Sequence, residues 1–357
     1  MDFLLEFLYR DLQEAKKMTD PYIESSWTKA DDTFEVPLRP ESLTDFVGQD
    51  SVKERLEIII GAAKQRKEPL GHCLFYGPPG LGKTTLANII AKTMGTQLVV
   101  TSGPVIEKAG DLAGILTNLK DGDILFIDEI HRLSRVVEEY LYPAMEDFSL
   151  DLLIDSGPSA RSVQVKLQHF TLVGATTRMG LLSGPMRSRF PFTCRLDYYH
   201  PKTLQNIILR SAKILSLSLT EEAAYEVASR ARGTPRVANN LLRWVRDYAQ
   251  IQAKKQVDKQ LVHHALEMLS IDHLGLDEMD KKILEILIDH YQGGPVGMNT
   301  LAVAIGEETS TLSDVYEPYL IMQGFIKRTP RGREATLHAY KHLGRTPPAK
   351  LNSGELL

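Results

Sequence analysis

The sequence has little cysteine and no long hydrophobic run. Only two of its 357 residues are cysteines, Cys73 and Cys194, and neither belongs to a CxxC motif or to a Cys/His metal-ligand spacing. We therefore expect buried free thiols in a reducing compartment rather than a disulfide. No apolar run approaches the ~20 residues that a membrane-spanning helix requires. The expected location is the cytoplasm.

An excess of positive charge is also lacking. The chain has 42 Lys and Arg against 46 Asp and Glu, so any contact with nucleic acid must depend on a local patch. Such a patch lies near the C-terminus in "FIKRTPRGREATLHAY", residues 325–340, where four cations are interrupted by a Pro and a Gly. The flanking patterns predict a tight basic loop between two short strands. A solvated charged turn is the alternative interpretation.

The length predicts more than one domain. Residues 1–37 are polar and form an N-terminal arm without the pattern of a signal peptide, and Met18 offers a second start site. From 38 to 199, β-rich apolar runs alternate with helical patterns, which is typical of an α/β domain with a parallel sheet. The predicted strands cover residues 73–77, 97–103, 123–128 and 170–177. A β-hairpin around Gly157–Pro158 is predicted between the last two strands.

The second half of the chain lacks strand signals until the basic loop. Residues 200–273 contain four helical segments with good start and stop residues, which predicts a small all-α domain. Residues 274–345 read as three helices followed by the basic hairpin, a winged-helix pattern related to the helix-turn-helix. Residues 346–357 form a tail.

The segment "GPPGLGKTT", residues 77–85, matches the phosphate-binding pattern GxxxxGK[ST] between a predicted strand and a predicted helix. Gly77, Gly80 and Gly82 allow backbone N–H groups to curl around phosphate oxygens. Lys83 would supply a positive charge to the β- and γ-phosphates, and Thr84 a hydroxyl to Mg²⁺. The positive end of the following helix points at the same anion.

The segment "ILFIDEIH", residues 124–131, supplies the partner of that loop. Four apolar residues predict a buried strand, and two acids follow at its carboxyl end, where open α/β sheets bind ligands. Asp128 is placed to hold the Mg²⁺ shell, and Glu129 to polarise an attacking water. The two motifs together predict nucleotide hydrolysis, and Glu129 favours water as the nucleophile over the acceptor of a kinase.

Two arginine-bearing segments extend this site. One is "GPMRSRF", residues 184–190, and the other is "RGTPRVANN", residues 232–240, at the start of a helix. An arginine at that helix start could reach a phosphate if the helical domain folds over the nucleotide as a lid. Chemistry alone does not choose between Arg187 and Arg189.

The order of these motifs, with "LRPESLTDFVGQ" before them and "GGPVG" and "RTPRGR" after them, resembles the RuvB family of Holliday-junction branch-migration motors in the AAA+ class. The resemblance covers about residues 36–345. It implies an α/β P-loop AAA+ domain at 38–199, an all-α lid at 200–273 and a C-terminal winged-helix domain at 274–345. It also implies an ATP- and Mg²⁺-dependent hexameric ring that moves double-stranded DNA at four-way junctions in recombination, DNA repair and the SOS response.

The resemblance also assigns residues to the nucleotide. Asp128 and Glu129 become the Mg²⁺-side acid and the water-activating base, and Thr177, rather than Thr176, becomes the sensor of the γ-phosphate. Arg189 becomes the finger that enters the neighbouring subunit, in preference to Arg187, and Arg236 the sensor of the lid. The residues that it places around the nucleotide are Leu38, Arg39, Gly80, Lys83, Thr84, Thr85, Glu146, Asp147, Phe148 and Tyr199.

The implied partners are a RuvA-type junction-binding protein, docked on the hairpin around Gly157–Pro158, and a RuvC-type resolvase. The basic loop becomes the wing of a DNA-binding domain, with Arg328, Arg331 and Arg333 contacting phosphates without sequence preference. A nucleotide-switched initiator of the origin-recognition type is the main rival, because it also joins an AAA+ module to a winged helix. A clamp-loader subunit would end in a helical collar, and a protein-remodelling ATPase would not need a basic wing.

Overall fold

A five-stranded sheet organises the first part of the chain. The computed structural model describes residues 36–153 and 162–348. The described residues divide into an N-terminal unit that ends at Asn239 and a C-terminal unit that begins at Asn240. The sheet of the N-terminal unit consists of β1 (Cys73–Tyr76), β2 (Leu98–Ser102), β3 (Ile124–Asp128), β6 (Thr171–Thr176) and β7 (Phe192–Arg195). Its strand order is β2-β3-β6-β1-β7, and all neighbours are parallel.

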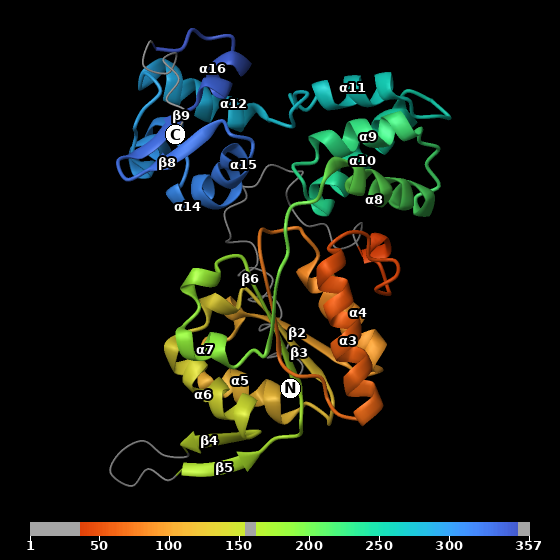
Figure 1. The fold of residues 1–357 in the computed structure, drawn as a ribbon, viewed down its shortest axis with the longest axis vertical. Helices are drawn as coiled ribbons and strands as arrows, with labels where there is room; N and C mark the ends of the chain where they lie inside the picture. The colour runs from red at the N-terminus through yellow and green to blue at the C-terminus, as the bar shows by residue number, and fades with distance from the viewer. Residues whose placement is uncertain (1–35, 154–161, 349–357) are drawn as a thin grey trace, which may run out of the picture. The chain divides into compact units, whose positions relative to one another are not determined.

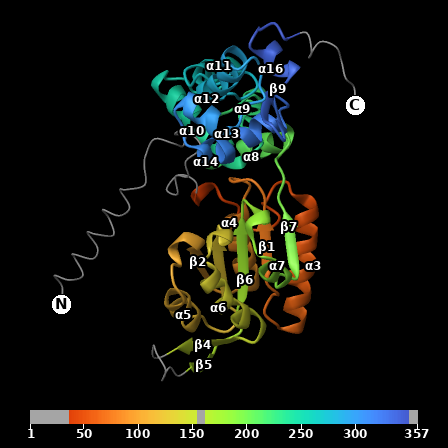
Figure 2. The same cartoon turned by 90° about the vertical axis from the view of Figure 1, so that its left-hand side faces the viewer.

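Helices cover both faces of this sheet, as buried parallel strands require (Figure 1). On one face, Leu125 and Ile127 of β3 share a core with Leu112 of α5 (Ala109–Thr117) and Leu141 of α6 (Arg135–Glu146). Helices α3 (Asp50–Arg66) and α4 (Lys83–Met94) lie side by side on the opposite side of the sheet (Figures 1 and 2). Short helical turns are η1 (Val36–Leu38), η2 (Gly103–Val105), η3 (Ile130–Arg132) and η4 (Met179–Leu181), and α7 spans Gly184–Ser188.

The hairpin predicted before the fourth strand is present. Strands β4 (Ser149–Leu153) and β5 (Ser162–Lys166) pair antiparallel and project from the end of the N-terminal unit (Figures 1 and 2). The Gly157–Pro158 turn lies outside the described residues, as do the N-terminal arm up to residue 35 and the end of the tail from residue 349. The prediction missed β7. Only one of its four residues, Cys194, is buried, so the strand lacks the alternation of buried and exposed residues that would mark it.

Four helices follow the sheet, as predicted. They are α8 (Pro201–Ile214), α9 (Glu221–Arg230), α10 (Pro235–Ile251) and α11 (Lys259–Glu267). Hydroxyl and carboxylate caps define two of their starts: Thr220 accepts a hydrogen bond from the N–H of Ala223, and Asp258 accepts one from that of Leu261. Helix α8 begins with a proline at its first position, where the missing N–H costs nothing.

The C-terminal unit continues with the predicted helices and hairpin. Helix α12 (Glu278–Glu285) runs into the π-helical turn η5 (Ile286–His290), and α13 (Met298–Ile305) follows. The next helical stretch comprises α14 (Thr309–Thr311), η6 (Leu312–Tyr316) and α15 (Glu317–Met322). Strands β8 (Ile326–Thr329) and β9 (Gly332–Ala335) form the hairpin, and α16 (Leu337–His342) ends the unit. Its core contains residues from every one of these helices except α14, among them Leu284, Leu301, Leu320 and Tyr340.

The "GGPVG" segment packs against the hairpin backbone to backbone. Val296 and Arg333 exchange two hydrogen bonds, with N to O distances of 2.9 and 2.7 Å. A Cβ atom on Gly332 would lie 2.3 Å from the Val296 carbonyl oxygen, which excludes any larger residue there. The segment is therefore bound to β9 close to the turn of the hairpin.

Two further observations concern the described residues. Cys73 and Cys194 are both free and buried, as predicted. Within the ranges 36–153 and 162–348, no helix has the length and hydropathy needed to cross a membrane.

Candidate nucleotide site

The loop between β1 and α4 is built for a tight approach of the backbone. Gly77 has a φ of +140°, and a Cβ atom there would lie 2.3 Å from the Leu196 carbonyl oxygen. Its N–H donates to the Thr176 carbonyl oxygen at 3.1 Å, which ties the start of the loop to the end of β6. Gly82 then caps α4 with a left-handed backbone, so the loop turns directly into the positive end of that helix.

Lys83 is held inside this loop. Its side chain is buried, and its Nζ donates to the carbonyl oxygens of Gly77 and Pro78, each at 2.8 Å. Burial lowers the pKa of Lys83 to about 8, although the carboxylates of Asp128 and Glu129 oppose that shift. A charge with so little access to water gains strongly from an anionic ligand placed beside it.

Two acids face the loop from the carboxyl end of β3. Asp128 is the last residue of the strand, and its Oδ1 accepts a hydrogen bond from the N–H of Glu129 at 2.9 Å. Burial raises the pKa of Asp128, and the hydrogen bond from Glu129 opposes that effect. Glu129 has a left-handed backbone with a φ of +45°, which is uncommon for a residue with a side chain. That conformation turns the chain sharply at the sheet edge.

Thr177 and His131 hold the Glu129 carboxylate. The Thr177 hydroxyl donates to Oε2 of Glu129 at 3.0 Å, and its N–H donates to the same oxygen at 3.3 Å. Nδ1 of His131 lies 3.1 Å from that carboxylate. Thr176, the alternative sensor, instead contacts Nδ1 of His131 at 2.8 Å through its hydroxyl. Thr177, and not Thr176, therefore contacts the Glu129 carboxylate.

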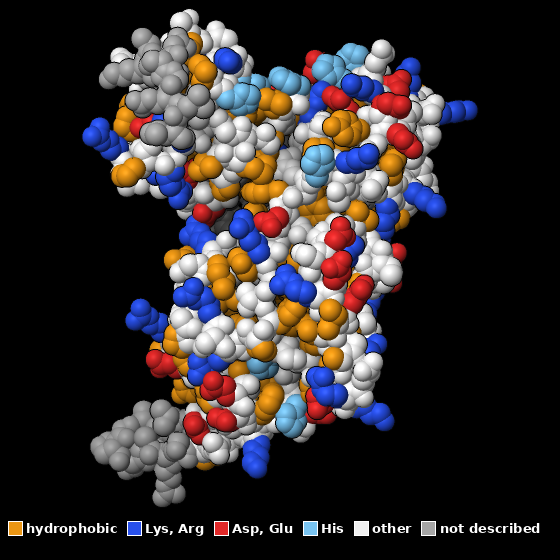
Figure 3. Space-filling model, viewed as in Figure 1, with side chains coloured by type: hydrophobic (Ala, Val, Ile, Leu, Met, Phe, Trp, Pro, Cys, Tyr) orange, Lys and Arg blue, Asp and Glu red, His pale blue; other side chains and the backbone are white. Residues whose placement is uncertain are grey.

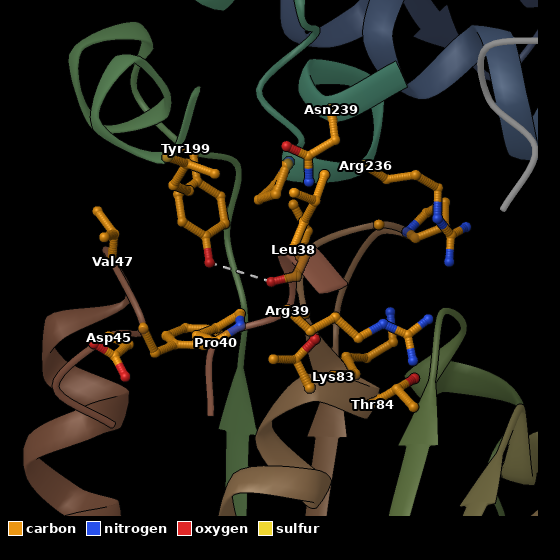
Figure 4. Close-up of a pocket in the computed structure, with 18 of the residues that line it drawn as sticks. Leu38, Arg39, Pro40, Asp45, Val47, Lys83, Thr84, Tyr199, Arg236 and Asn239 are labelled. Carbon is orange, nitrogen blue, oxygen red and sulfur yellow. Dashed lines mark hydrogen bonds between the residues drawn. The ribbon is translucent and has the colours of Figure 1, made fainter. Parts of the chain in front are cut away.

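A pocket lies beside Lys83 and the two acids (Figure 4). It is also lined by residues between Leu38 and Val47 and by residues between Tyr199 and Asn239. Lys83 and Thr84 lie at one end of the close-up, and Asn239 lies at the other. The predicted residues that line the pocket are Leu38, Arg39, Gly80, Lys83, Thr84, Thr85, Asp128, Glu129, Thr177, Tyr199 and Arg236. The structure thus brings together predicted site residues that are far apart in the sequence.

The start of the helical region borders the pocket and contacts the loop and the segment before the sheet. Arg210 of α8 donates from Nη1 to the Leu38 carbonyl oxygen at 2.8 Å. Tyr199 donates its hydroxyl to the Leu81 carbonyl oxygen at 3.2 Å and its N–H to that of Gly233 at 2.8 Å. The Arg236 N–H donates to the Gly80 carbonyl oxygen at 3.4 Å. The loop, the segment before the sheet and the helices therefore line one pocket.

Several lining residues were not predicted. They are Pro40, Asp45, Phe46, Val47, Pro79, Leu81, Ile207, Arg210, Pro235 and Asn239. Eight of them come from the "LRPESLTDFVGQ", "GPPGLGKTT" and "RGTPRVANN" segments, which are quoted as motifs above without each residue being assigned. Asn239 is oriented by Ser211, whose hydroxyl donates to its Oδ1 at 2.8 Å. No local pattern marks Ile207 or Arg210, because their role depends on where α8 packs.

Four predicted residues are not brought to this pocket. Arg189 instead pairs with Glu146, with 3.1 Å between Nη2 and Oε2, and its guanidinium lies over the Tyr142 ring at 4.2 Å from the centroid. Asp147 and Phe148 continue from Glu146 at the end of α6. Phe148 packs edge-on against the rings of His169 and Phe170. These residues form a separate cluster at the α6–α7 end, and the exposed Arg187 takes no part in it.

The basic hairpin forms as predicted, but its three arginines differ. Arg331 lies at the exposed turn between β8 and β9. Arg328 and Arg333 face each other across the two strands and both pair with Glu317. On the face drawn in Figure 3, Lys and Arg side chains are interspersed with Asp and Glu rather than gathered into one field. The hairpin is thus a local concentration of charge on a mixed surface.

Comparison with known families matches almost all of the described chain. Residues 38–196 match the Holliday junction DNA helicase RuvB P-loop domain, residues 199–272 the RuvB AAA lid domain, and residues 273–344 the RuvB C-terminal winged helix domain. The chain belongs to the RuvB family.

Similar RuvB proteins cover nearly the whole chain. The Holliday junction branch migration complex subunit RuvB of Protochlamydia amoebophila is 68% identical over 326 residues, which is 91% of this chain and 98% of that protein. The protein of the same name from Chlamydia trachomatis serovar A is 58% identical over 317 residues, 89% and 95% of the two chains. The structure of the Thermotoga maritima RuvB Holliday junction branch migration motor is 52% identical, with a TM-score of 0.80, and covers 87% of this chain and 100% of that one.

Proposed function

We propose that this chain is an ATP-driven ring motor that moves duplex DNA to drive branch migration of Holliday junctions. The observation that carries the proposal is the pocket in which buried Lys83, the acids Asp128 and Glu129, and Thr177 converge on one phosphate-binding loop. Membership of the RuvB family supports ATP as the nucleotide and the four-way junction as the DNA substrate. We propose residues 38–199, 200–273 and 274–345 as its three domains.

Mg²⁺ fits the donor atoms at the phosphate end of the pocket. Thr84 offers a hydroxyl and Asp128 a carboxylate, both on the pocket lining. Within the described ranges no group of three or more His, Cys, Asp and Glu forms a complete metal cage. Mg²⁺ needs none, because it binds through one or two protein oxygens together with substrate phosphates and water. When bound, it would neutralise charge on the phosphates.

The remaining chemistry falls to side chains of this chain. Lys83, released from the carbonyl oxygens of Gly77 and Pro78, would neutralise the β- and γ-phosphates. Glu129 would accept a hydrogen bond from the attacking water while Thr177 and His131 orient its carboxylate. Arg236, bound through its N–H to Gly80 of the loop, would sense the phosphates from the lid. Hydrolysis would thus be linked to the positions of β6 and α10.

Arg189 is proposed to act on the nucleotide of a neighbouring subunit. It lies in the α6–α7 cluster with Glu146 and not among the residues that line its own pocket. An arginine that stabilises transition-state charge in trans makes hydrolysis depend on assembly. Glu146, Asp147 and Phe148 are proposed to border the neighbour's nucleotide from the same side. This arrangement supports a homo-oligomeric ring, for which we propose six subunits.

The remaining assignments concern DNA and partner proteins. We propose that Arg328, Arg331 and Arg333 form a sequence-independent contact with DNA phosphates. The β4–β5 hairpin is proposed to dock a RuvA-type protein, and a RuvC-type resolvase would act on the same junction. We propose a cytoplasmic location, where free thiols such as Cys73 and Cys194 stay reduced.

The proposal is tested with a synthetic four-way junction whose arms carry a fluorophore and a quencher. We expect ATP-dependent dissociation that a RuvA-type protein accelerates and that a non-hydrolysable analogue of ATP does not support. The origin-recognition type of initiator would bind DNA in the presence of ATP without dissociating the junction. Equal binding with no dissociation, with active RuvA-type protein present, would reject the motor in favour of that switch.

A further inference from the structure

Glu317 is a buried acid beneath the basic hairpin. It is the first residue of α15 and only 3% exposed. Its two carboxylate oxygens accept hydrogen bonds from both arginines of the hairpin strands. Arg328 donates from Nη2 to Oε2 at 2.6 Å and from Nε to Oε1 at 3.4 Å. Arg333 donates from Nε to Oε1 at 2.7 Å and from Nη2 to Oε2 at 3.1 Å.

Glu317, Arg328 and Arg333 form a triad in which the acid offsets the repulsion between the two arginines. Arg328 and Arg333 are direct cross-strand partners, and like charges in that register repel. Burial raises the pKa of Glu317, but the hydrogen bonds and charges of the two arginines outweigh burial and hold that pKa below its ordinary value. The carboxylate is therefore ionised at neutral pH. Two cations and one anion leave the triad with one net positive charge.

The same bonds fix which edge of each guanidinium faces outward. Both arginines use Nε and Nη2 toward Glu317, so Nη1 of each one takes no part in the bonds to that carboxylate. Arg328 keeps 59% of its side-chain surface exposed, and Arg333 keeps 17%. A planar guanidinium with one edge fixed presents its remaining N–H groups in a set direction.

We propose that Glu317 is a positioning residue for DNA, which holds Arg328 and Arg333 side by side so that their outward N–H groups meet one backbone phosphate. This inference rests on the proposed DNA-binding role of the hairpin. The inference predicts a change in DNA affinity opposite to the one expected from net charge alone. Removal of an acid from a DNA-binding surface ordinarily strengthens binding, whereas removal of Glu317 should weaken it, because two arginines lose their orientation.

The test compares two substitutions that change the charge equally. Glu317→Gln removes the buried partner of the arginines. Glu334→Gln removes the partner of Lys327, 3.0 Å away on the same hairpin and partly exposed. Binding of the full-length variants to two unrelated fluorescent duplexes is measured across a salt series. We expect Glu334→Gln to match or slightly exceed the parent protein. We expect Glu317→Gln to bind about tenfold more weakly, with a salt slope smaller by about one, because one phosphate is no longer neutralised.

Two conservative variants, Arg333→Lys and Glu317→Asp, test the same role if Glu317→Gln does not fold. Arg333→Lys retains the charge but cannot bridge both carboxylate oxygens, so its binding should also fall. Thermal midpoints are recorded for every variant, because a purely structural role would lower the midpoint and leave the salt slope unchanged. Glu317→Asp keeps the charge on a shorter side chain and should give an intermediate affinity.

The outcomes separate this inference from the function on which it rests. If Glu317→Gln binds as tightly as Glu334→Gln or more tightly, Glu317 only neutralises charge, and the positioning role is wrong. An unchanged salt slope in Glu317→Gln or Arg333→Lys with a lowered midpoint also overturns it. If Arg331→Ala and Arg328→Ala leave the slope unchanged as well, the hairpin does not bind DNA, and the proposed wing function fails first.

Discussion

Thr177 donates a hydrogen bond from its hydroxyl to the carboxylate of Glu129 at 3.0 Å. The two residues follow neighbouring parallel strands, Glu129 after β3 and Thr177 after β6. The acid proposed to activate water is therefore held by the residue proposed to sense the γ-phosphate. A phosphate that draws the Thr177 hydroxyl away would free Glu129 at the moment when the substrate is bound.

Lys83→Ala and Glu129→Gln should fail at different steps. Loss of Lys83 removes a buried charge from the phosphate site, so ATP binding itself should weaken along with hydrolysis. Glu129→Gln keeps the size of the side chain and should bind ATP but turn it over at least about a hundredfold more slowly. Calorimetric affinities and single-turnover rates distinguish the two. An equal loss of ATP affinity in both variants would remove Glu129 from its proposed role.

Thr177→Val should uncouple hydrolysis from nucleotide binding, because the valine side chain matches the shape of threonine but cannot donate to Glu129 or to a phosphate, and only the backbone N–H bond to Glu129 remains. We expect nearly unchanged ATP affinity and a turnover reduced about tenfold or more, a loss comparable to one charge-assisted hydrogen bond. Thr177→Ser keeps the hydroxyl and is the matched control. Full activity in Thr177→Val would argue that the threonine is structural.

Arg189→Ala should leave ATP binding by single subunits nearly unchanged while hydrolysis in the assembled protein falls about 10³-fold or more. Mixing this variant with Glu129→Gln should restore part of the activity, since some interfaces then pair an intact Glu129 with an intact Arg189. Arg187→Ala is the control, because Arg187 is exposed and two residues away. If Arg187→Ala shows the loss and Arg189→Ala does not, the assignment belongs to the other arginine.

The triple substitution Arg328→Ala, Arg331→Ala and Arg333→Ala should weaken binding to any duplex by a similar factor. Phosphates that are neutralised release condensed counterions, so the slope of log affinity against log salt should fall by roughly two to three if each arginine has its own phosphate, and by about two if Arg328 and Arg333 share one. Junction dissociation should fail even at saturating ATP. Salt titrations on two unrelated duplexes check this, and a loss confined to one sequence would mean that the hairpin reads bases.

His72 predicts how the N-terminal unit responds to acid. Burial lowers the pKa of His72 from its ordinary 6.5, although its hydrogen bond to the Met145 carbonyl oxygen opposes that shift. Its Nδ1 accepts from the N–H of Leu172, so protonation would break a buried bond. The unfolded chain therefore binds this proton first, and stability falls as pH drops from about 6.5 toward the folded pKa.

The measurement is the thermal midpoint between pH 7.5 and pH 5.5. His72→Gln retains a donor and an acceptor without a titratable ring. We expect the variant to have a lower midpoint at pH 7.5 and a smaller decrease on acidification than the parent protein. An identical decrease in both proteins would assign the acid sensitivity to other groups.

The sequence predicted those elements whose signals are local. The phosphate-binding loop is marked by Gly77, Gly80 and Lys83, and the adjacent acid pair ends a run of four buried apolar residues. Strand β7 was missed because its burial comes from pairing with β1 rather than from its own pattern. Arg210 and Ile207 were missed for the same reason, since α8 carries no sign of which of its side chains will meet Leu38.

The wing shows the complementary limit. Charge density identified Arg328, Arg331 and Arg333 as one group, yet the structure separates an exposed Arg331 from two arginines bound to Glu317. The sequence pattern places Glu317 in a helix, eleven positions before Arg328, and gives no sign that the two side chains meet. Proximity of that kind arises only when the helix and the hairpin share a core.

The bond from Arg210 to the Leu38 carbonyl oxygen has a bearing on turnover. It fastens α8 to the short segment that precedes the sheet, and Leu38 and Arg210 both line the pocket. Release of spent nucleotide between α8 and the Leu38 segment would require this bond to break. In many enzymes such an opening, rather than the chemical step, limits the cycle. The rate of the motor would then be set by release of its product rather than by hydrolysis.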